Sequence, residues 1–191
     1  MEYIVYRGLT RHAPITESAL PSLTFSGNKA TAEYYAYNQN DRNLSGHCPT
    51  VYSATIEIKN PFIVDKNYSG VEFNELTRVL IRKEVFALIQ KYEQYVKSTV
   101  IYQELRESGK VSNNFRLEII GQNPELLTVP LPAYVFLDDP KIVDALVNSG
   151  YDGSINRGTG VSMNDVEYRI FKGIEQIRGS RCELGKETGT K

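Results

Sequence analysis

The residue of this sequence best placed for chemistry is a single carboxylate at the start of a short strand. Glu167 lies at the beginning of residues 166–171, directly after the polar run 159–165. Strict alternation would place Ile170 and Phe171 on opposite faces, which predicts a strand buried on both faces. A carboxylate at the end of a core strand is firmly held in dry surroundings, where it could stabilise a developing positive charge. The alternative for this stretch alone is an ordinary glutamate exposed to water at a strand end.

The composition is that of a globular protein with one packed core. The chain has 191 residues, of which 41% are hydrophobic and 24% charged. This length is enough for one domain with a real core, or for one domain with an elaborated insertion. The net charge of −1 gives no reason to expect general binding to nucleic acid or membranes. Cys48 and Cys182 form no CxxC pair, so we expect neither a disulfide nor a metal site. We find no secretion leader and no apolar run near the roughly 18 residues of a membrane helix, so we expect a cytoplasmic protein.

Periodicity and turn residues predict an α+β domain. We expect strands at residues 2–7, 23–26, 50–59 and 166–171, a turn into a strand over 151–156, and a last turn and edge strand over 173–177. We expect helices at 28–36 and 139–150, and one long helix or two over 72–107, while 115–129 fit either a strand or a helix. These elements predict a single domain over 1–178, followed by a flexible polar tail over 179–191.

Five short motifs follow one another along residues 3–177. They are Tyr6-Arg7-Gly8, Thr24-Phe25-Ser26 with Ala32-Glu33-Tyr34-Tyr35-Ala36, Asn60-Pro61-Phe62-Ile63-Val64-Asp65, Gly150-Tyr151-Asp152-Gly153, and Glu167-Tyr168-Arg169-Ile170-Phe171 followed by Gln176-Ile177. No single motif is specific, but their order resembles the ADP-ribosyltransferase fold, in particular the bacterial and phage enzymes with an Arg–Ser–Glu signature. The last three motifs look most like the transferase domains of phage polyvalent and anti-defence proteins. The resemblance implies a split β-sheet core with the helical middle as an elaboration.

The resemblance also implies a substrate and a role for each matched residue. The substrate would be NAD+, whose bond between nicotinamide and ribose breaks with positive charge on the sugar, as in glycoside hydrolysis. Arg7 matches the arginine that holds phosphate and ribose oxygens, with a surface salt bridge as the alternative. Ser26 matches the serine that positions the glutamate and the ribose, and it could also cap the following helix. Glu167 matches the catalytic glutamate, which would accept a hydrogen bond from the ribose 2′-hydroxyl.

An aromatic residue on the first helix would pack against the nicotinamide ring. Tyr35 matches it, with Tyr34 as the alternative if the register shifts by one, and core packing is the alternative for either tyrosine. The remaining NAD+ contacts implied by the first two motifs come from Tyr6, Gly8, Thr24 and Phe25.

The acceptor side departs from the family pattern. Arginine-specific members carry Glu or Gln two residues before the catalytic glutamate, where this chain has the shorter Asp165. The serine motif is often Ser-Thr-Ser, whereas only Ser26 is matched here. Asp152 is a second acceptor-side candidate, although turn formation explains it equally well.

The sequence therefore predicts a mono-ADP-ribosyltransferase that moves ADP-ribose from NAD+ to a macromolecule, with a protein side chain as the expected acceptor. It would act in the cytosol as a phage or bacterial effector or counter-defence factor, without a metal. Two alternatives stay open. One is ADP-ribosylation of a nucleic acid, disfavoured by the lack of basic charge, or hydrolysis of NAD+. The other is a non-catalytic binding module on the same fold. Residues 72–107 carry none of the motifs and are the candidate for target recognition.

Overall fold

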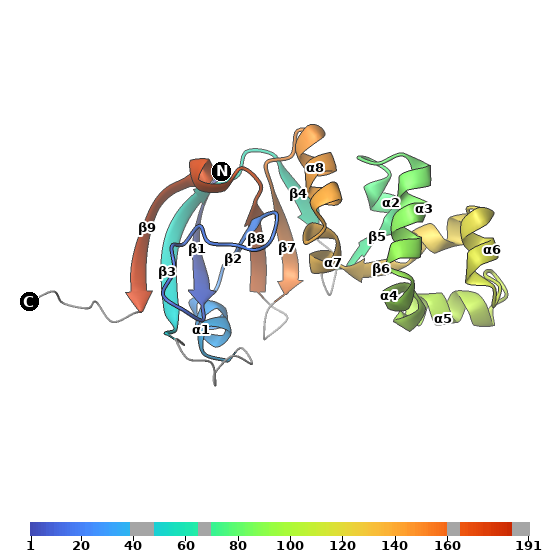
Figure 1. Ribbon diagram of the computed structural model, residues 1–191, viewed down its shortest axis with the longest axis horizontal. Coiled ribbons are helices and arrows are strands. Elements are labelled where there is room, and N and C mark those ends of the chain that lie inside the picture. The colour runs from blue at the N-terminus through green and yellow to red at the C-terminus, as the bar shows by residue number, and fades with distance from the viewer. Residues whose placement is uncertain (39–47, 65–69, 160–164, 185–191) are drawn as a thin grey trace, which may run out of the picture. The chain divides into compact units, whose positions relative to one another are not determined.

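Two groups of residues pack separately in the computed structural model (Figure 1). The structure describes residues 1–38, 48–64, 70–159 and 165–184. The sheet unit comprises residues 1–69 and 137–191, and the inserted unit comprises residues 70–136. The inserted unit therefore falls within the span that the sequence assigns to one domain.

Seven strands form one mixed sheet in the sheet unit. In spatial order they are β4 (Pro61–Val64), β7 (Gly153–Thr159), β8 (Asp165–Ile170), β2 (Leu23–Ser26), β1 (Glu2–Leu9), β3 (Thr50–Glu57) and β9 (Ile177–Leu184). β4 and β7 run parallel, and the other neighbouring pairs run antiparallel. β1 pairs with β3 along its whole length, but it pairs with β2 only where Tyr6 faces Ser26. Among the neighbouring strands of this sheet, β1 and β2 therefore have the fewest paired residues.

The predicted strands 2–7, 23–26, 50–59 and 166–171 are confirmed as β1, β2, β3 and β8. The prediction of a flexible tail from residue 179 is wrong for its first part, because β9 continues to Leu184 and pairs with β3. This pairing satisfies backbone groups of β3 that would otherwise form an open sheet edge. Gln176 anchors the start of β9, since its side-chain NH2 donates to the carbonyls of Glu57 at 3.0 Å and Asp152 at 2.8 Å. Residues 185–191 lie outside the described part of the chain.

The two faces of the sheet carry different cores. One face holds an apolar cluster of Val5, Leu23, Phe25, Ala54, Ile56, Ile58, Ile155 and Ile170. On the other face, helix α1 (Lys29–Asn38), which confirms the predicted helix 28–36, packs Ala32 and Ala36 against Val51. Gly8 makes this packing possible, because a Cβ at this position would lie 1.9 Å from the carbonyl oxygen of Ala32. The glycine of the first motif is thus required by the helix that forms one wall of the site.

The predicted helix 139–150 is confirmed as α8 (Pro140–Asn148). Its start follows a common capping pattern, in which the Asp139 carboxylate accepts a hydrogen bond from the Lys141 amide at 3.1 Å and a proline occupies the first turn. The chain then turns at Gly150, whose φ of 91° lies in the left-handed region that favours glycine. Helix α7 (Ala133–Leu137) precedes α8, and the short helix η3 (Gly173–Gln176) precedes β9.

The inserted unit is mainly helical. Its elements are β5 (Gly70–Glu72), α2 (Phe73–Leu76), α3 (Arg82–Lys91), α4 (Glu93–Ser98), α5 (Val100–Glu107), α6 (Phe115–Ile120), η2 (Pro124–Thr128) and β6 (Pro130–Pro132). The prediction of one or two helices over 72–107 is wrong, because this stretch forms four short ones. Tyr92 interrupts the series with φ −99° and ψ 24°, and Thr99 is extended and accepts a hydrogen bond from the Tyr102 amide. Within 115–129, the residues form helices rather than a strand.

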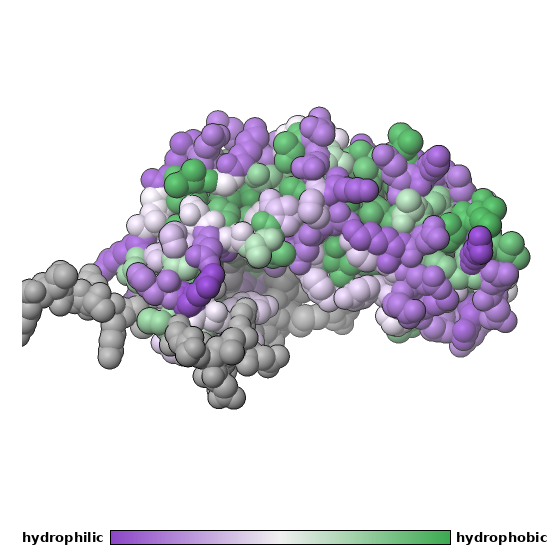
Figure 2. All heavy atoms as spheres, viewed as in Figure 1, coloured by the Kyte–Doolittle hydropathy of each residue, from purple (hydrophilic) through white to green (hydrophobic). Residues whose placement is uncertain are grey.

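Aromatic side chains hold the inserted unit together. The rings of Phe73 and Phe136 meet edge to face with their centroids 5.2 Å apart. The rings of Tyr102 and Phe115 do the same at 5.9 Å. Residues 70–136 are described throughout, and none of their polar or charged side chains is buried. Figure 2 shows hydrophobic side chains at the surface over α6, where Leu117 and Ile120 are exposed. In the described ranges of the whole chain, none of the helices has the length and apolar character needed to cross a membrane.

Candidate active site

A cavity of about 390 Å³ is bounded by β1, β2, α1 and β8 of the sheet unit. Its walls are formed by Tyr6, Arg7, Gly8, Leu9, Thr10, Ser18, Leu20, Thr24, Phe25, Ser26, Thr31, Ala32, Tyr35, Asp165, Glu167 and Arg169. Every residue that the sequence proposes for catalysis or NAD+ contact is among them, together with one of the two acceptor-side candidates, Asp165. The structure therefore brings together side chains that are up to 163 positions apart in the sequence, from Tyr6 to Arg169.

The register of the sheet explains why these side chains meet. Asn156 of β7 faces Glu167 of β8, Glu167 faces Ser26 of β2, and Ser26 faces Tyr6 of β1. Residues that face each other across a sheet project from the same side of it. They form one row across four strands, on the face that α1 covers beside Tyr6.

Two donors hold the carboxylate of Glu167. Its Oε1 accepts a hydrogen bond from Asn156 Nδ2 at 2.9 Å and another from Arg169 Nε at 2.8 Å. None of the described residues donates to Oε2. The side chain is 22% exposed, so it is fixed in the wall of the cavity and still accessible to a ligand.

Arg169 is buried behind Glu167 and pairs with two carboxylates. Besides Glu167 it contacts Asp138 through NH1. Burial disfavours the charge of the guanidinium, but the Glu167 carboxylate and the hydrogen bonds to Glu167 and Asp138 outweigh it and hold the pKa of Arg169 above its usual value. Arg169 therefore stays charged at any working pH.

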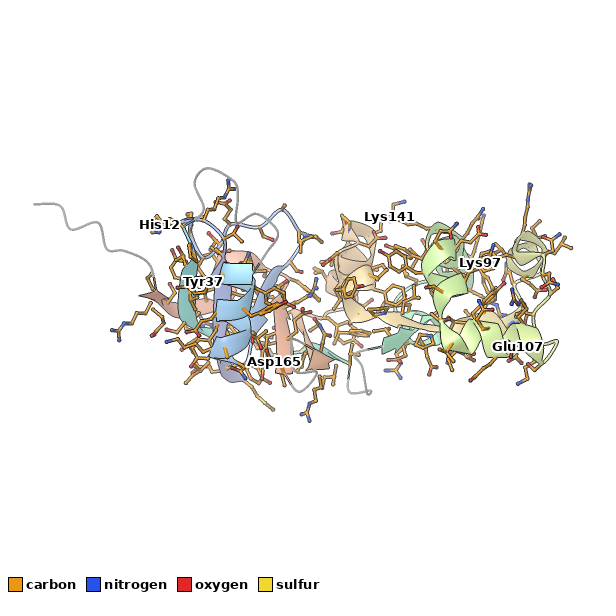
Figure 3. All side chains as sticks on the ribbon, turned by 90° about the horizontal axis from the view of Figure 1, so that it is seen from below. His12, Tyr37, Lys97, Glu107, Lys141 and Asp165 are labelled. Carbon is orange, nitrogen blue, oxygen red and sulfur yellow. The ribbon has the colours of Figure 1, made fainter. Side chains whose placement is uncertain are left out.

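Ser26 links β2 to the start of α1 and to β8. Its Oγ accepts a hydrogen bond from the Asn28 amide at 2.9 Å and lies within hydrogen-bond distance of Asp165 Oδ2. The other oxygen of Asp165 accepts the Val166 amide at 2.7 Å. Figure 3 shows Asp165 beside the end of α1 opposite the end that carries Tyr37. Asp165 is thus engaged with Ser26 in the cavity wall. The cap of α1 is not Ser26 but Asn28, whose Oδ1 accepts a hydrogen bond from the Ala30 amide at 2.8 Å.

Arg7 is buried beside the end of the row on β1, directly after Tyr6. Its NH1 donates to the Thr24 carbonyl at 3.0 Å and its NH2 to the Glu17 carbonyl at 2.6 Å, while its carbon Cζ lies 5.6 Å from the centre of the Phe25 ring. Burial lowers the pKa of Arg7, and the charge of Glu17 partly offsets that effect. Arg7 is therefore a brace between β1, β2 and the loop before β2, and not a surface salt bridge.

Tyr35, and not Tyr34, lies in the wall of the cavity. Burial raises the pKa of the Tyr35 phenol, and the charges of Glu167, Tyr34 and Asp165 raise it further. Its hydroxyl group therefore lies within electrostatic reach of both site carboxylates. The ring of Tyr34 meets that of Tyr35 edge to face, with centroids 5.8 Å apart.

Asp152 lies outside the cavity wall. Its two carboxylate oxygens accept hydrogen bonds from the backbone amides of Lys59 at 2.9 Å and Asn60 at 2.8 Å. It is 9% exposed and ties the turn after β3 to the start of β7. The structure therefore gives Asp152 the role in a turn that was the alternative to its function at the acceptor side.

Three residues that contact Glu167, or contact its partner Arg169, were missed by the sequence interpretation. Arg169 lies two positions after Glu167 on the same strand, so alternation alone places both on one face and could have identified it. Asn156 and Asp138 carry no local signal, because their contacts depend on sheet register and on the turn before α8.

Buried polar atoms in the cavity wall suit a polar, anionic ligand. Arg7 Nε and Thr24 Oγ1 are buried and have no hydrogen-bond partner among the described residues. Each such group costs about 1–3 kcal/mol when it is left without a partner. A nucleotide with phosphate and ribose oxygens offers acceptors for both groups, while Tyr35 offers a flat surface to a ring. The residues present therefore fit NAD+ as a substrate.

No family model, curated protein or solved structure matches this chain. The interpretation of the site therefore depends on its own geometry and on the order of its motifs.

Proposed function

We propose that this protein is a mono-ADP-ribosyltransferase that moves ADP-ribose from NAD+ to a macromolecular acceptor, with a protein side chain as the expected acceptor. The observation that carries the proposal is that Arg7, Ser26, Tyr35 and Glu167 line one cavity although they come from four different elements. These are the four residues to which the motif resemblance assigns phosphate binding, ribose positioning, ring stacking and catalysis. The narrow pairing between β1 and β2 also supports a split sheet of the ADP-ribosyltransferase type.

The reaction requires that positive charge on a sugar be stabilised. The bond between ribose C1′ and the nicotinamide nitrogen breaks, the electron pair leaves with nicotinamide, and the acceptor's nucleophile bonds to C1′ and loses its proton to solvent. Glu167 would accept a hydrogen bond from the ribose 2′-hydroxyl and face the positive charge that develops on the ribose. Because Arg169 and Asn156 both bond Oε1, the carboxylate is oriented before substrate arrives and Oε2 is left for the ribose.

The other residues would bind and orient the substrate. Arg7 supplies a buried positive charge and a free Nε beside Thr24, which suits a phosphate or ribose oxygen. Tyr35 supplies the ring against which nicotinamide packs. Ser26 lies between Glu167 and Tyr6 in the row and contacts Asp165, and its hydroxyl would bond the nicotinamide ribose there.

Release of nicotinamide from NAD+ by the purified protein tests the proposal. Glu167→Gln keeps the size of the side chain and removes its charge, so turnover should fall by about 10²–10³-fold, the usual cost of one electrostatic group in a transition state. Glu33→Gln, on α1 outside the cavity wall, is the matched control and should behave as the parent does. Equal turnover in the parent and in Glu167→Gln would contradict the proposal.

A second assay, read together with nicotinamide release, separates the alternatives. Labelled NAD+ incubated with a cell lysate, followed by protease or nuclease treatment, distinguishes a protein acceptor from a nucleic acid. Nicotinamide release without labelled macromolecule would indicate hydrolysis. A parent protein that binds NAD+ or a partner but releases no nicotinamide would indicate a non-catalytic module.

A further inference from the structure

The guanidinium of Arg169 is the most deeply buried charge near the cavity. The residue is 2% exposed, and its two carboxylate partners, Glu167 and Asp138, have side chains that are 22% and 34% exposed. Removing a charge from water costs several kcal/mol, as a rough figure, and a buried ion pair often stabilises a fold no better than well-packed apolar side chains. The stability of the sheet unit therefore does not by itself explain an arginine at this position.

The geometry of the guanidinium couples its two partners. The group is planar, and its N–H bonds point in fixed directions. Its NH1 is held by Asp138, from the turn between α7 and α8, and its Nε donates to Glu167 Oε1 at 2.8 Å. Fixing NH1 fixes the plane of the group, which in turn fixes the direction in which Nε meets Glu167.

Neighbouring polar atoms are poorly satisfied, which also argues against an arrangement selected for stability. Ser154 of β7 and Thr24 of β2 face Arg169 in the register of the sheet. Ser154 Oγ, Asn156 Oδ1 and Thr24 Oγ1 are buried and have no hydrogen-bond partner in the described residues. Buried polar groups without partners are uncommon and tend to accumulate where a site is held for function.

From these contacts we infer that Arg169 is the positioning residue of Glu167 and that Asp138 holds Arg169 in that role. Asp138, Arg169 and Asn156 together fix Glu167 through one oxygen, Oε1, so that Oε2 faces the cavity. The catalytic part of this inference rests on the proposed function, whereas the orientation of Glu167 can be tested without it.

Three variants and one control test the kinetic part. Arg169→Met keeps most of the volume and removes the fork, so kcat for NAD+ should fall by about 10²-fold, the cost of a misplaced catalytic group, with KM close to that of the parent. Arg169→Lys keeps the charge but not the planar fork and should restore only part of kcat. Asp138→Asn should give a smaller loss. Arg178→Met removes an exposed arginine that pairs with Glu57 and should leave kcat and KM unchanged. Parental kcat in Arg169→Met, or a loss confined to KM, would overturn the inference.

Crystal structures of the parent and Arg169→Met test the orientation directly. We expect Glu167 in one conformer in the parent, and in a different or divided conformation in the variant. If the parent releases no nicotinamide, the proposed function fails, and the conformation of Glu167 still decides this inference. An unchanged Glu167 in Arg169→Met would overturn it. Should Arg169→Met not fold, Asp138→Asn carries both measurements, because the Asp138 side chain is one-third exposed and its loss is tolerable. In that variant, parental kcat together with an unchanged Glu167 would overturn the inference.

Discussion

The sheet unit and the inserted unit bury different kinds of side chain. All eleven buried polar or charged residues of the described chain belong to the sheet unit, and they include Arg7, Asp165 and Arg169 of the cavity wall. The inserted unit buries only apolar and aromatic side chains, such as Phe73 and Phe136. One unit thus holds charges in place at an energetic cost, while the other is packed as an ordinary apolar core.

This difference indicates where function constrains the sequence. A buried polar group is stable only when it has a partner, yet Arg7 Nε, Ser154 Oγ and Asn156 Oδ1 have none in the part of the chain that the structure describes. Asn156 belongs to the row of residues that leads across the sheet into the cavity wall, and Ser154 and Arg7 are near it on β7 and β1. Mutations in the sheet unit should therefore change activity, with or without a change in stability. Mutations in the inserted core should change stability alone.

The largest expected effect is a loss of stability in either core. Phe73→Ala in the inserted unit and Phe25→Ala in the sheet unit each remove a buried ring, which costs about 3–5 kcal/mol of the free energy of unfolding. Only Phe25 packs against Arg7 in the cavity wall. Only Phe25→Ala should therefore also lower NAD+ turnover when turnover is measured under conditions in which both variants are folded. Urea denaturation and nicotinamide release measure the two effects. Equal losses of turnover in both variants would break the comparison.

A smaller loss is expected where β1 and α1 pack most closely. In Gly8→Ala the new methyl group meets the Ala32 carbonyl, so α1 must move, and overpacking of this kind costs about 1–3 kcal/mol. Because α1 carries Tyr35, KM for NAD+ should rise as well. Gly179→Ala in β9 is the control, since nothing lies within 4 Å of its added Cβ. Thermal unfolding that shifts equally in the two variants would show that the helix tolerates the displacement.

The polar row itself should separate activity from stability. Asn156→Ala removes one donor from Glu167 Oε1, and a lost hydrogen bond to a charged group costs about 1.5–3 kcal/mol, some of which should appear as lower kcat. Ser154→Ala removes a buried hydroxyl that has no partner among the described residues, so it should be neutral or stabilising and leave kcat unchanged. Calorimetry and steady-state kinetics distinguish them. A destabilising Ser154→Ala would mean that its hydroxyl group has a partner.

The smallest effect concerns the phenol of Tyr35 at alkaline pH. Its charged form is the phenolate, and the folded protein raises its pKa, so the unfolded chain releases the proton first as pH rises. The stability that Tyr35 adds is complete below its ordinary pKa of about 10 and is lost as pH rises through the folded value. Tyr35→Phe should therefore lose less stability between pH 9 and 12 than the parent does, as urea titrations at each pH will show. The variant keeps the ring, so its KM for NAD+ should stay near that of the parent, whereas Tyr35→Ala should raise it. Identical pH curves for the parent and Tyr35→Phe would contradict the assignment.

Local signals were sufficient to predict much of the sheet unit. β2 is bounded by Gly27, α8 has a capping aspartate and a proline in its first turn, and β3 alternates clearly. The four segments of 72–107 were harder to predict, because their apolar spacing continues across the breaks. Thr99 is one visible signal there, since its hydroxyl group caps α5. β9 has little apolar character and is held by its pairing with β3, so composition alone suggested a tail.

The motifs predicted which side chains line the cavity but not how they are held. Ser26 and Asp165 meet across 139 positions, and Arg169 meets Asp138 across 31. Such pairs depend on strand order and register, which no single stretch of sequence specifies. Asp165 lies in the cavity wall, where it contacts Ser26, and Asp152 supports a turn outside that wall.

We propose that Glu167 directs the transfer of ADP-ribose to a macromolecule. Intact-mass spectrometry of lysate proteins incubated with NAD+ and the parent protein, or with Glu167→Gln, tests it most directly. We expect at least one protein species heavier by one ADP-ribose with the parent, and none with Glu167→Gln. The same modified species at the same rate with Glu167→Gln, or unmodified proteins and unconsumed NAD+ with the parent, would contradict it.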